Sequence, residues 1–142
     1  MMNIELRRIR HRPDTIDGQI RIDGRKVCDC AENAHHCLPA GTYRIAIMPC
    51  RQHARKMPVV GESAHCSSCH RGPYIGINTS MPRFCPMLAP GNGIHNRHDG
   101  SILVGKRGSR GLLLHPLTTF DLLYERIRRS AERGNEVTLT IR

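Results

Sequence analysis

A chain of 142 residues is long enough to bury one hydrophobic core, and we expect a single domain over residues 1–142. Three Tyr, two Phe and no Trp predict a mainly aliphatic core, while 13 Gly and nine Pro favour a β-rich fold with many turns. The opening residues MMNIELRRIR contain no apolar segment, and no stretch approaches transmembrane length. We therefore expect neither a signal peptide nor a membrane span, and a cytoplasmic location.

The formal net charge is +10, and arginine supplies most of it because lysine occurs only at Lys26, Lys56 and Lys106. This excess predicts an acidic partner or nucleic acid bound through an arginine-rich surface. The alternative is that the arginines are scattered as solvated surface residues. No long run of like charges occurs, and no aromatic residues are interleaved with basic ones, so base stacking is not indicated.

Alternating apolar and polar residues predict a first strand over residues 3–10. Asp17-Gly18 then predicts a loop, which is followed by a second short strand over residues 19–22. Asp23-Gly24 is typical of a tight hairpin turn, because both of its central positions tolerate a positive φ. The return strand of this hairpin is expected over residues 27–31.

The central part of the chain is expected to contain one strand and a long loop. The strand covers residues 42–47 and ends at Met48-Pro49. Residues 50–101 are rich in Gly and Pro, and a loop of that length needs a stabilising element such as a bound ion. Ile102-Leu103-Val104 is predicted as a short buried strand. The basic, glycine-rich segment 105–111 is predicted as a loop, but it lacks the spacing of a P-loop.

The clearest predicted element is an amphipathic helix near the C-terminus. Thr118 and Asp121 predict its start as a capping box, and Gly134 predicts its end. Alternation over residues 137–141 predicts a closing strand. We therefore expect an α+β fold, a mostly antiparallel β barrel or roll with one C-terminal amphipathic helix and a closing strand. The apolar stripe of the helix comprises Phe120, Leu123, Tyr124, Ile127 and Ala131.

Two pairs of metal-ligand residues lie in the middle of the chain. Cys50 and His53 form a C-x2-H pair, and Cys66 and Cys69 form a C-x2-C pair. Two such pairs on either side of a loop can close a tetrahedral zinc site. The spacing predicts one zinc ion bound by these four residues within a loop-rich insertion at about 50–85. Replacement ligands in the same stretch are His65, His70 and Cys85.

Other readings of the cysteines stay open. The segment from Cys66 to His70 also satisfies the C-x2-C-H pattern of c-type haem attachment, which requires export of the chain. The loop cysteines can also be unligated. Cys28 and Cys30 lie on the same face of a predicted strand, where cysteine usually behaves as a small buried apolar residue. A second metal cluster could instead combine these two residues with His35, His36 and Cys37.

A second candidate site lies in the glycine-rich segment 91–101. Ser101, His95, His98 and Asp99 supply the residue types of a hydrolytic Ser-His-Asp set. The alternative is a turn-rich loop, since Gly, Asn and Asp are the usual turn residues. The segment has no G-x-S-x-G nucleophile elbow.

Several short motifs outside the 50–85 insertion occur together in this chain. They are Asp23-Gly24 followed by Val27-Cys28-Asp29 and Glu32-Asn33, then Pro39-Ala40-Gly41-Thr42-Tyr43-Arg44, Pro90-Gly91-Asn92, Gly100-Ser101-Ile102-Leu103-Val104-Gly105 and Thr118-Thr119-Phe120. In this combination the chain resembles an uncharacterised family of small proteins from bacterial and tailed-phage genomes, classed as a domain of unknown function.

Members of that family commonly carry a His before the Gly-Asn pair and a Cys before the Ile-Leu-Val run. The layout is similar to that of the L,D-transpeptidases of peptidoglycan, in which a His activates a Cys that attacks a peptide carbonyl. In this chain the two positions fall on Ala89 and Ser101, so both members of the dyad are replaced. The missing dyad favours a non-catalytic domain that acts through binding, and the ligand spacing adds stabilisation by zinc. The resemblance implies that this domain belongs to a phage or mobile element. The alternative is a peptidoglycan-directed transpeptidase-like or hydrolytic enzyme that uses Ser101 with His95 or His98.

Overall fold

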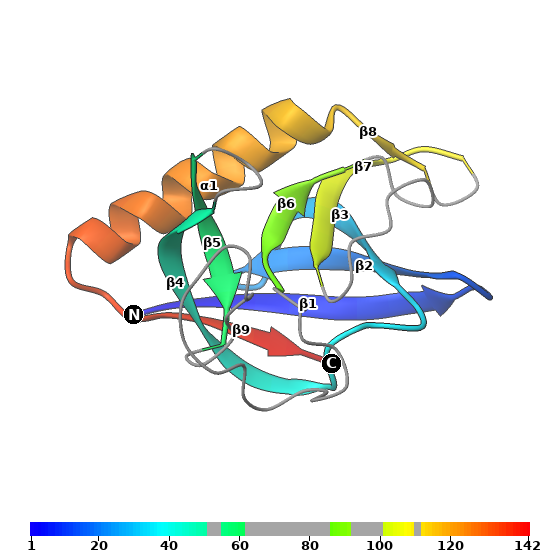
Figure 1. Ribbon diagram of the computed structural model, residues 1–142, viewed down its shortest axis with the longest axis horizontal. Coiled ribbons are helices and arrows are strands. Elements are labelled where there is room, and N and C mark those ends of the chain that lie inside the picture. The colour runs from blue at the N-terminus through cyan, green and yellow to red at the C-terminus, as the bar shows by residue number, and fades with distance from the viewer. Residues whose placement is uncertain (51–54, 62–85, 92–100, 110–111) are drawn as a thin grey trace.

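The computed structural model describes residues 1–50, 55–61, 86–91, 101–109 and 112–142 (Figure 1). Within these ranges the chain forms nine strands and one helix. The elements are β1 (Met2–His11), β2 (Thr15–Ile22), β3 (Arg25–Asn33), β4 (Gly41–Cys50), β5 (Arg55–Val60), β6 (Leu88–Pro90), β7 (Ile102–Arg107), β8 (Leu113–Leu114), α1 (Pro116–Glu132) and β9 (Val137–Ile141).

The strands form one sheet in the order β5-β4-β9-β1-β2-β3-β7-β6, and β8 pairs with β7. Two neighbouring pairs, β1 with β9 and β6 with β7, are parallel, and the others are antiparallel. The two edge strands approach each other through a bridge between Val59 and Met87 and a hydrogen bond from the Val60 N–H to the Pro86 carbonyl at 2.9 Å. The sheet therefore nearly closes on itself, and the predicted barrel-like α+β fold is confirmed.

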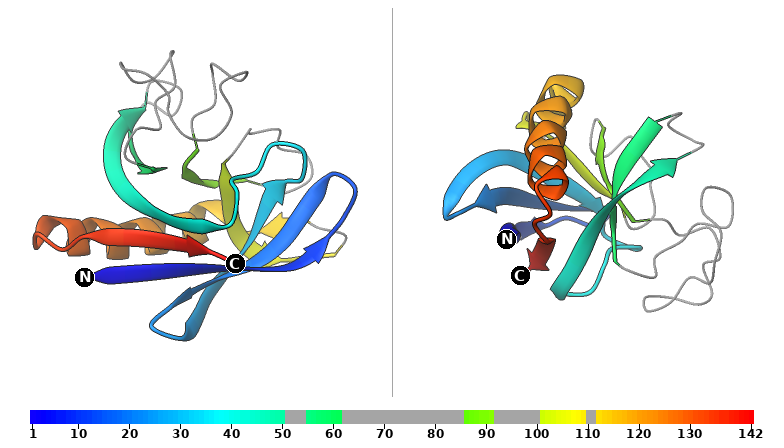
Figure 2. Two further views of the ribbon diagram at one scale, coloured as in Figure 1. Left: turned by 90° about the horizontal axis from the view of Figure 1, so that it is seen from below. Right: turned by 90° about the vertical axis from the view of Figure 1, so that its left-hand side faces the viewer.

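The terminal strands β1 and β9 lie side by side (Figure 2). The hairpin turn between β2 and β3 forms at Asp23 (φ 53°) and Gly24 (φ 78°), as predicted. In β1, Ile4 and Leu6 point to the core and are fully buried. The largest completely buried side chains are Ile4, Leu6, Ile20, Leu38, Met57, Leu88, Ile102, Phe120, Leu123, Ile127 and Leu139.

The prediction of a loop at Asp17-Gly18 is wrong, because β2 already begins at Thr15. Gly18 pairs with Arg8 on one side and with Cys30 on the other. A Cβ atom on Gly18 would lie 2.9 Å from the Arg7 carbonyl oxygen and 3.0 Å from the Cys30 sulfur. The glycine is therefore required for close packing inside the sheet and does not mark a turn.

The prediction that residues 50–101 are mainly loop is also incorrect at two places, because this region contains β5 and β6. Pro58 lies within β5, which is an edge strand of the main sheet path, where proline is tolerated. At the start of β5, the Arg55 guanidinium lies 5.2 Å from the Phe120 ring centroid and 4.7 Å from that of Tyr124. These cation–π contacts connect β5 to α1. The strand β7 also extends beyond the predicted end, to Arg107.

The helix α1 lies along β7, β6 and β5 (Figure 1). It starts at Pro116, and its N-cap is His115 (φ 50°) with no side-chain cap, so the predicted capping box at Thr118 and Asp121 is wrong. Proline at the first helical position explains the earlier start, because its fixed φ suits that place. None of the helices in the described parts of the chain is long and apolar enough to cross a membrane.

The buried face of α1 matches most of the predicted stripe. Phe120, Leu123 and Ile127 are buried, and Tyr124 packs partly against the core. Ala131 is exposed, which corrects the prediction at that position. The buried stripe therefore ends one turn before the predicted position, and Gly134, with a φ of 81°, follows the end of the helix as predicted.

Candidate functional site

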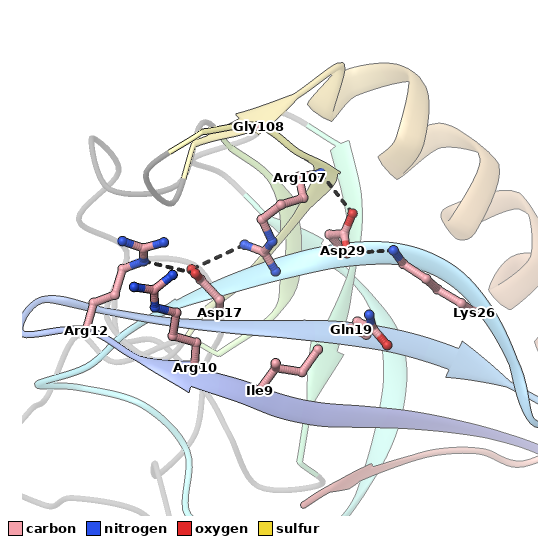
Figure 3. Close-up of a pocket in the computed structure, with 9 residues that line it drawn as sticks. All are labelled: Ile9, Arg10, Arg12, Asp17, Gln19, Lys26, Asp29, Arg107 and Gly108. Atoms are coloured by element: carbon pink, nitrogen blue, oxygen red, sulfur yellow. Dashed lines mark hydrogen bonds and ion pairs between the residues drawn. The ribbon is translucent and has the colours of Figure 1, made fainter.

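A groove of about 490 Å³ lies over strands β1, β2, β3 and β7 (Figure 3). We call it the basic groove. It is on the face of the sheet opposite the core, since Asp17 and Gln19 alternate along β2 with the core-facing Gly18 and Ile20. Its lining residues are Ile9, Arg10, Arg12, Asp17, Gln19, Lys26, Asp29, Arg107 and Gly108.

An irregularity in β1 shapes one wall of the basic groove. The register between β1 and β2 shifts between Arg8 and Arg10, so that Arg8 pairs with Gly18 and Arg10 pairs with Asp17. A bulge of this kind inserts one residue and redirects the side chains that follow it. Ile9 is the inserted residue, and both Ile9 and Arg10 line the groove.

The Asp17 carboxylate lies between two guanidinium groups. Its Oδ2 atom accepts a hydrogen bond from Arg12 Nε at 3.0 Å, and its Oδ1 atom lies 3.2 Å from Arg107 Nη1. The second contact is an ion pair without aligned hydrogen-bond geometry, because both of its atoms are buried and have no hydrogen-bond partner. Only 6% of the Asp17 side chain is exposed, so the charge of the carboxylate is matched by arginine in place of water.

Arg107 is the most firmly held cation of the basic groove. Its Nη2 atom donates to the carbonyl oxygens of Gly18 at 2.7 Å and Cys30 at 3.1 Å. Its backbone N–H donates to Asp29 Oδ2 at 2.8 Å. The other oxygen of Asp29 lies 3.0 Å from Lys26 Nζ. These bonds connect β7 to β2 and β3 and fix the guanidinium in one orientation.

The charges of the basic groove do not balance. Of the lining side chains in the described ranges, four are cationic and two are acidic, and both acids are already paired with groove cations. The exposed side chain of Arg10 has no hydrogen bond or ion pair with any residue in the described ranges. An excess of two positive charges therefore faces solvent in a concave surface, which favours binding of an anion.

A second charged pair, Arg8 with Glu32, is buried at one end of the sheet. Arg8 donates to the Glu32 carboxylate twice, through Nε at 3.0 Å and Nη2 at 2.9 Å, and also to the Leu38 carbonyl. The exposed fractions of the two side chains are 12% and 1%. Burial lowers the pKa of Arg8, but the hydrogen bond and the charge of Glu32 outweigh it, so the pKa is raised. This pair ties β1 to β3 and to the segment that precedes β4.

The predicted catalytic residues are only partly described. Ser101 immediately precedes β7 and is buried, with 4% of its surface exposed. The next residue, Ile102, pairs with Glu32, so Ser101 lies near the end of β3. Ala89 is buried in β6. The predicted partners His95, His98 and Asp99 lie outside the described residues.

Most of the predicted zinc ligands also fall outside the described ranges. Cys50 is the last residue of β4, and only its place in the strand is described. His53, Cys66 and Cys69 lie outside the described residues. The same holds for the replacement ligands His65, His70 and Cys85, and for the C-x2-C-H pattern from Cys66 to His70.

Cys28 and Cys30 are core residues with 4% and 0% of their surface exposed. Burial raises the pKa of Cys28 to about 12 and that of Cys30 well above its ordinary value. Among the described residues, no group of three or more His, Cys, Asp or Glu could hold a metal, which leaves the second predicted cluster with Cys37, His35 and His36 without support.

Sequence reasoning missed the basic groove. Its charged residues come from four strands and from the connection between β1 and β2, which carries Arg12, and Asp17 was assigned to a loop. The available signal was the alternation of polar and apolar residues from Thr15 to Ile20, which is typical of a strand with one polar face. Arg107 gave no local signal, because its partners lie about 80 or more residues earlier in the chain.

The fold and the basic groove define a small, barrel-like α+β domain with a positively charged surface groove. No family model, no curated protein and no solved structure matches this chain. The family resemblance and the function therefore remain proposals that depend on the residues themselves.

Proposed function

We propose that this protein is a non-catalytic binding domain that holds an anionic partner in the basic groove. The observation that carries the proposal is the uneven charge of the groove, in which Arg10, Arg12, Lys26 and Arg107 outnumber two acids that are already paired. The net charge of +10 adds a long-range attraction for the same kind of partner.

Two features support a non-catalytic role. Among the described residues, the lining of the basic groove includes no Ser, Cys or His, so this part of the lining offers neither a nucleophile nor a base that titrates near neutral pH. Ser101 is buried, whereas a nucleophilic hydroxyl must reach its substrate. The family resemblance adds the proposal that the domain belongs to a phage or another mobile element.

The insertion at about 50–85 is proposed to be held by one zinc ion. The support is the spacing of Cys50, His53, Cys66 and Cys69, which matches a closed tetrahedral site of two ligand pairs. In this proposal the metal has a structural role, since all four of its positions are occupied by protein ligands. The zinc site and the basic groove use different residues and can be tested separately.

The proposed function is tested by binding of fluorescent heparin, a sulfated polyanion, to wild type, Arg10→Glu and Arg133→Glu. Arg133 is an exposed residue that follows the last residue of α1 and does not line the groove, and its substitution changes the net charge by the same amount. We expect Arg10→Glu to weaken binding about tenfold. A tenfold change in affinity corresponds to about 1.4 kcal/mol, which is close to the contribution of one hydrogen bond to a charged group. Equal effects of the two substitutions would contradict a role for the groove.

A further inference from the structure

We infer that the anionic partner is the phosphodiester backbone of double-stranded nucleic acid, bound without recognition of sequence. The inference rests on the proposed function and adds the class of partner. It starts from the composition of the basic groove, where guanidinium groups are the main donors and Gln19 is the one uncharged polar side chain in the described part of the lining. The planar fork of a guanidinium matches two phosphate oxygens at once.

The apolar content of the basic groove argues against an acidic protein as the partner. Of the lining residues that the structure describes, Ile9 is the one large apolar side chain and none is aromatic. Stable protein–protein interfaces depend on buried aromatic or aliphatic anchors at their centre, with charged residues depleted there. A groove centred on the Asp17 carboxylate and its arginines has the opposite arrangement. Contacts to phosphates need only the charges.

The same lining favours a duplex over a single strand. Proteins that hold single strands stack the bases on aromatic side chains, and the described lining of the groove has none. Base-specific reading of a duplex needs an element that enters one of its grooves. The arginines of this site lie within a concave surface, which can receive one sugar–phosphate strand but does not project towards base edges. Affinity should therefore not depend on sequence.

The four cations have different parts in this site. Arg107 is held by Asp17, Gly18 and Cys30, so it positions Asp17 and is not the main ligand contact. Arg12 contacts Asp17 through Nε, an arrangement that orients the rest of its guanidinium towards the groove (Figure 3). Arg10 and Arg12, with Lys26 at the rim, are the proposed phosphate contacts.

The number of contacts predicts the salt dependence. Two to three phosphate contacts on a duplex give a slope of about −2 to −3 in a plot of log K against log salt concentration. We would measure this slope by fluorescence anisotropy with two 20-base-pair duplexes of unrelated sequence. Wild type should bind both duplexes with the same affinity within about threefold, since phosphate contacts carry no sequence information. Arg10→Gln and Arg12→Gln should each weaken binding to both duplexes and make the slope shallower by about 1.

Three controls distinguish the possible failures. Arg133→Gln changes charge by the same amount outside the groove and should leave the slope unchanged. A single strand of the same sequence should bind more weakly than its duplex. Poly-L-glutamate tests a carboxylate polymer in place of a phosphate polymer. Melting curves of each variant establish that it is folded.

Three results would overturn the inference and leave the proposed function intact. The first is groove-dependent binding of poly-L-glutamate without binding of the duplex, and the second is tighter binding of the single strand than of the duplex. The third is a preference for one duplex sequence of more than about tenfold. If Arg10→Gln and Arg12→Gln affect none of the probes more than Arg133→Gln does, both the inference and the proposed function are wrong.

Discussion

Replacing Glu32 by methionine should destabilise the fold by about 3 kcal/mol, the lower end of the usual range for breaking a buried ion pair. The Glu32 side chain is 1% exposed and accepts two hydrogen bonds from Arg8, at 3.0 and 2.9 Å. Without the carboxylate, the Arg8 guanidinium stays in the fold without its counter-charge. We choose the lower end because 12% of the Arg8 side chain remains accessible to water. A loss of this size is a large share of the stability of an ordinary domain.

The double substitution Arg8→Met with Glu32→Met should recover most of that loss. Removing both charges leaves an apolar pair of similar length, and such replacements are often neutral or stabilising. Recovery should fall short by about 1 kcal/mol, because the Leu38 carbonyl also loses its hydrogen bond from Arg8. The two single variants and the double variant form a cycle that isolates the coupling between the side chains.

The assay is urea denaturation at pH 7 followed by circular dichroism. The control is Arg7→Met, which breaks an ion pair of similar length with Glu5, 3.1 Å, on the same strand. Arg7 is 53% exposed, so this change should cost less than about 1 kcal/mol. If Glu32→Met costs no more than Arg7→Met, or if the cycle shows no coupling, the Arg8–Glu32 pair does not stabilise the fold in the way described.

Three further predictions concern the core, the buried thiol and the zinc site. Leu123→Ala should lower the free energy of unfolding by about 2–5 kcal/mol because Leu123 is 1% exposed. The control Leu122→Ala, at a position that is 68% exposed, should change it by less than about 0.5 kcal/mol. Similar values for the two variants would place Leu123 outside the core. Burial raises the pKa of Cys28 from 9.0 to about 12. Above pH 9.0 the unfolded chain therefore loses the thiol proton that the folded chain keeps. The free energy of unfolding should consequently fall as the pH rises towards 12. This decline should be smaller in Cys28→Ala, and an unchanged slope would contradict the burial argument. Elemental analysis of protein purified without chelator should find one zinc per chain. Cys66→Ser should reduce the zinc content, while the control Cys37→Ser should not. Zinc-free wild-type protein would refute the site.

The amino-acid sequence alone was enough to predict the elements that depend on local periodicity. The strand β1 shows in the alternation of Ile4 and Leu6 with charged residues, and the hairpin shows in Asp23-Gly24, where the turn itself requires a positive φ at both positions. The buried face of α1 follows from the helical spacing of Phe120, Leu123 and Ile127. Each of these signals lies within a few residues of the chain and needs no distant partner.

The remaining features depend on contacts between segments that are far apart in the sequence. Asp17 is a strand residue because Arg12 and Arg107 neutralise its carboxylate, and Arg107 comes from β7. Pro58 is accepted in β5 because that strand lies at the edge of the main sheet path. The basic groove exists only once four strands are in register, since its charges come from each of them. No short window of sequence contains such information, because tertiary contacts decide which local preferences are overridden.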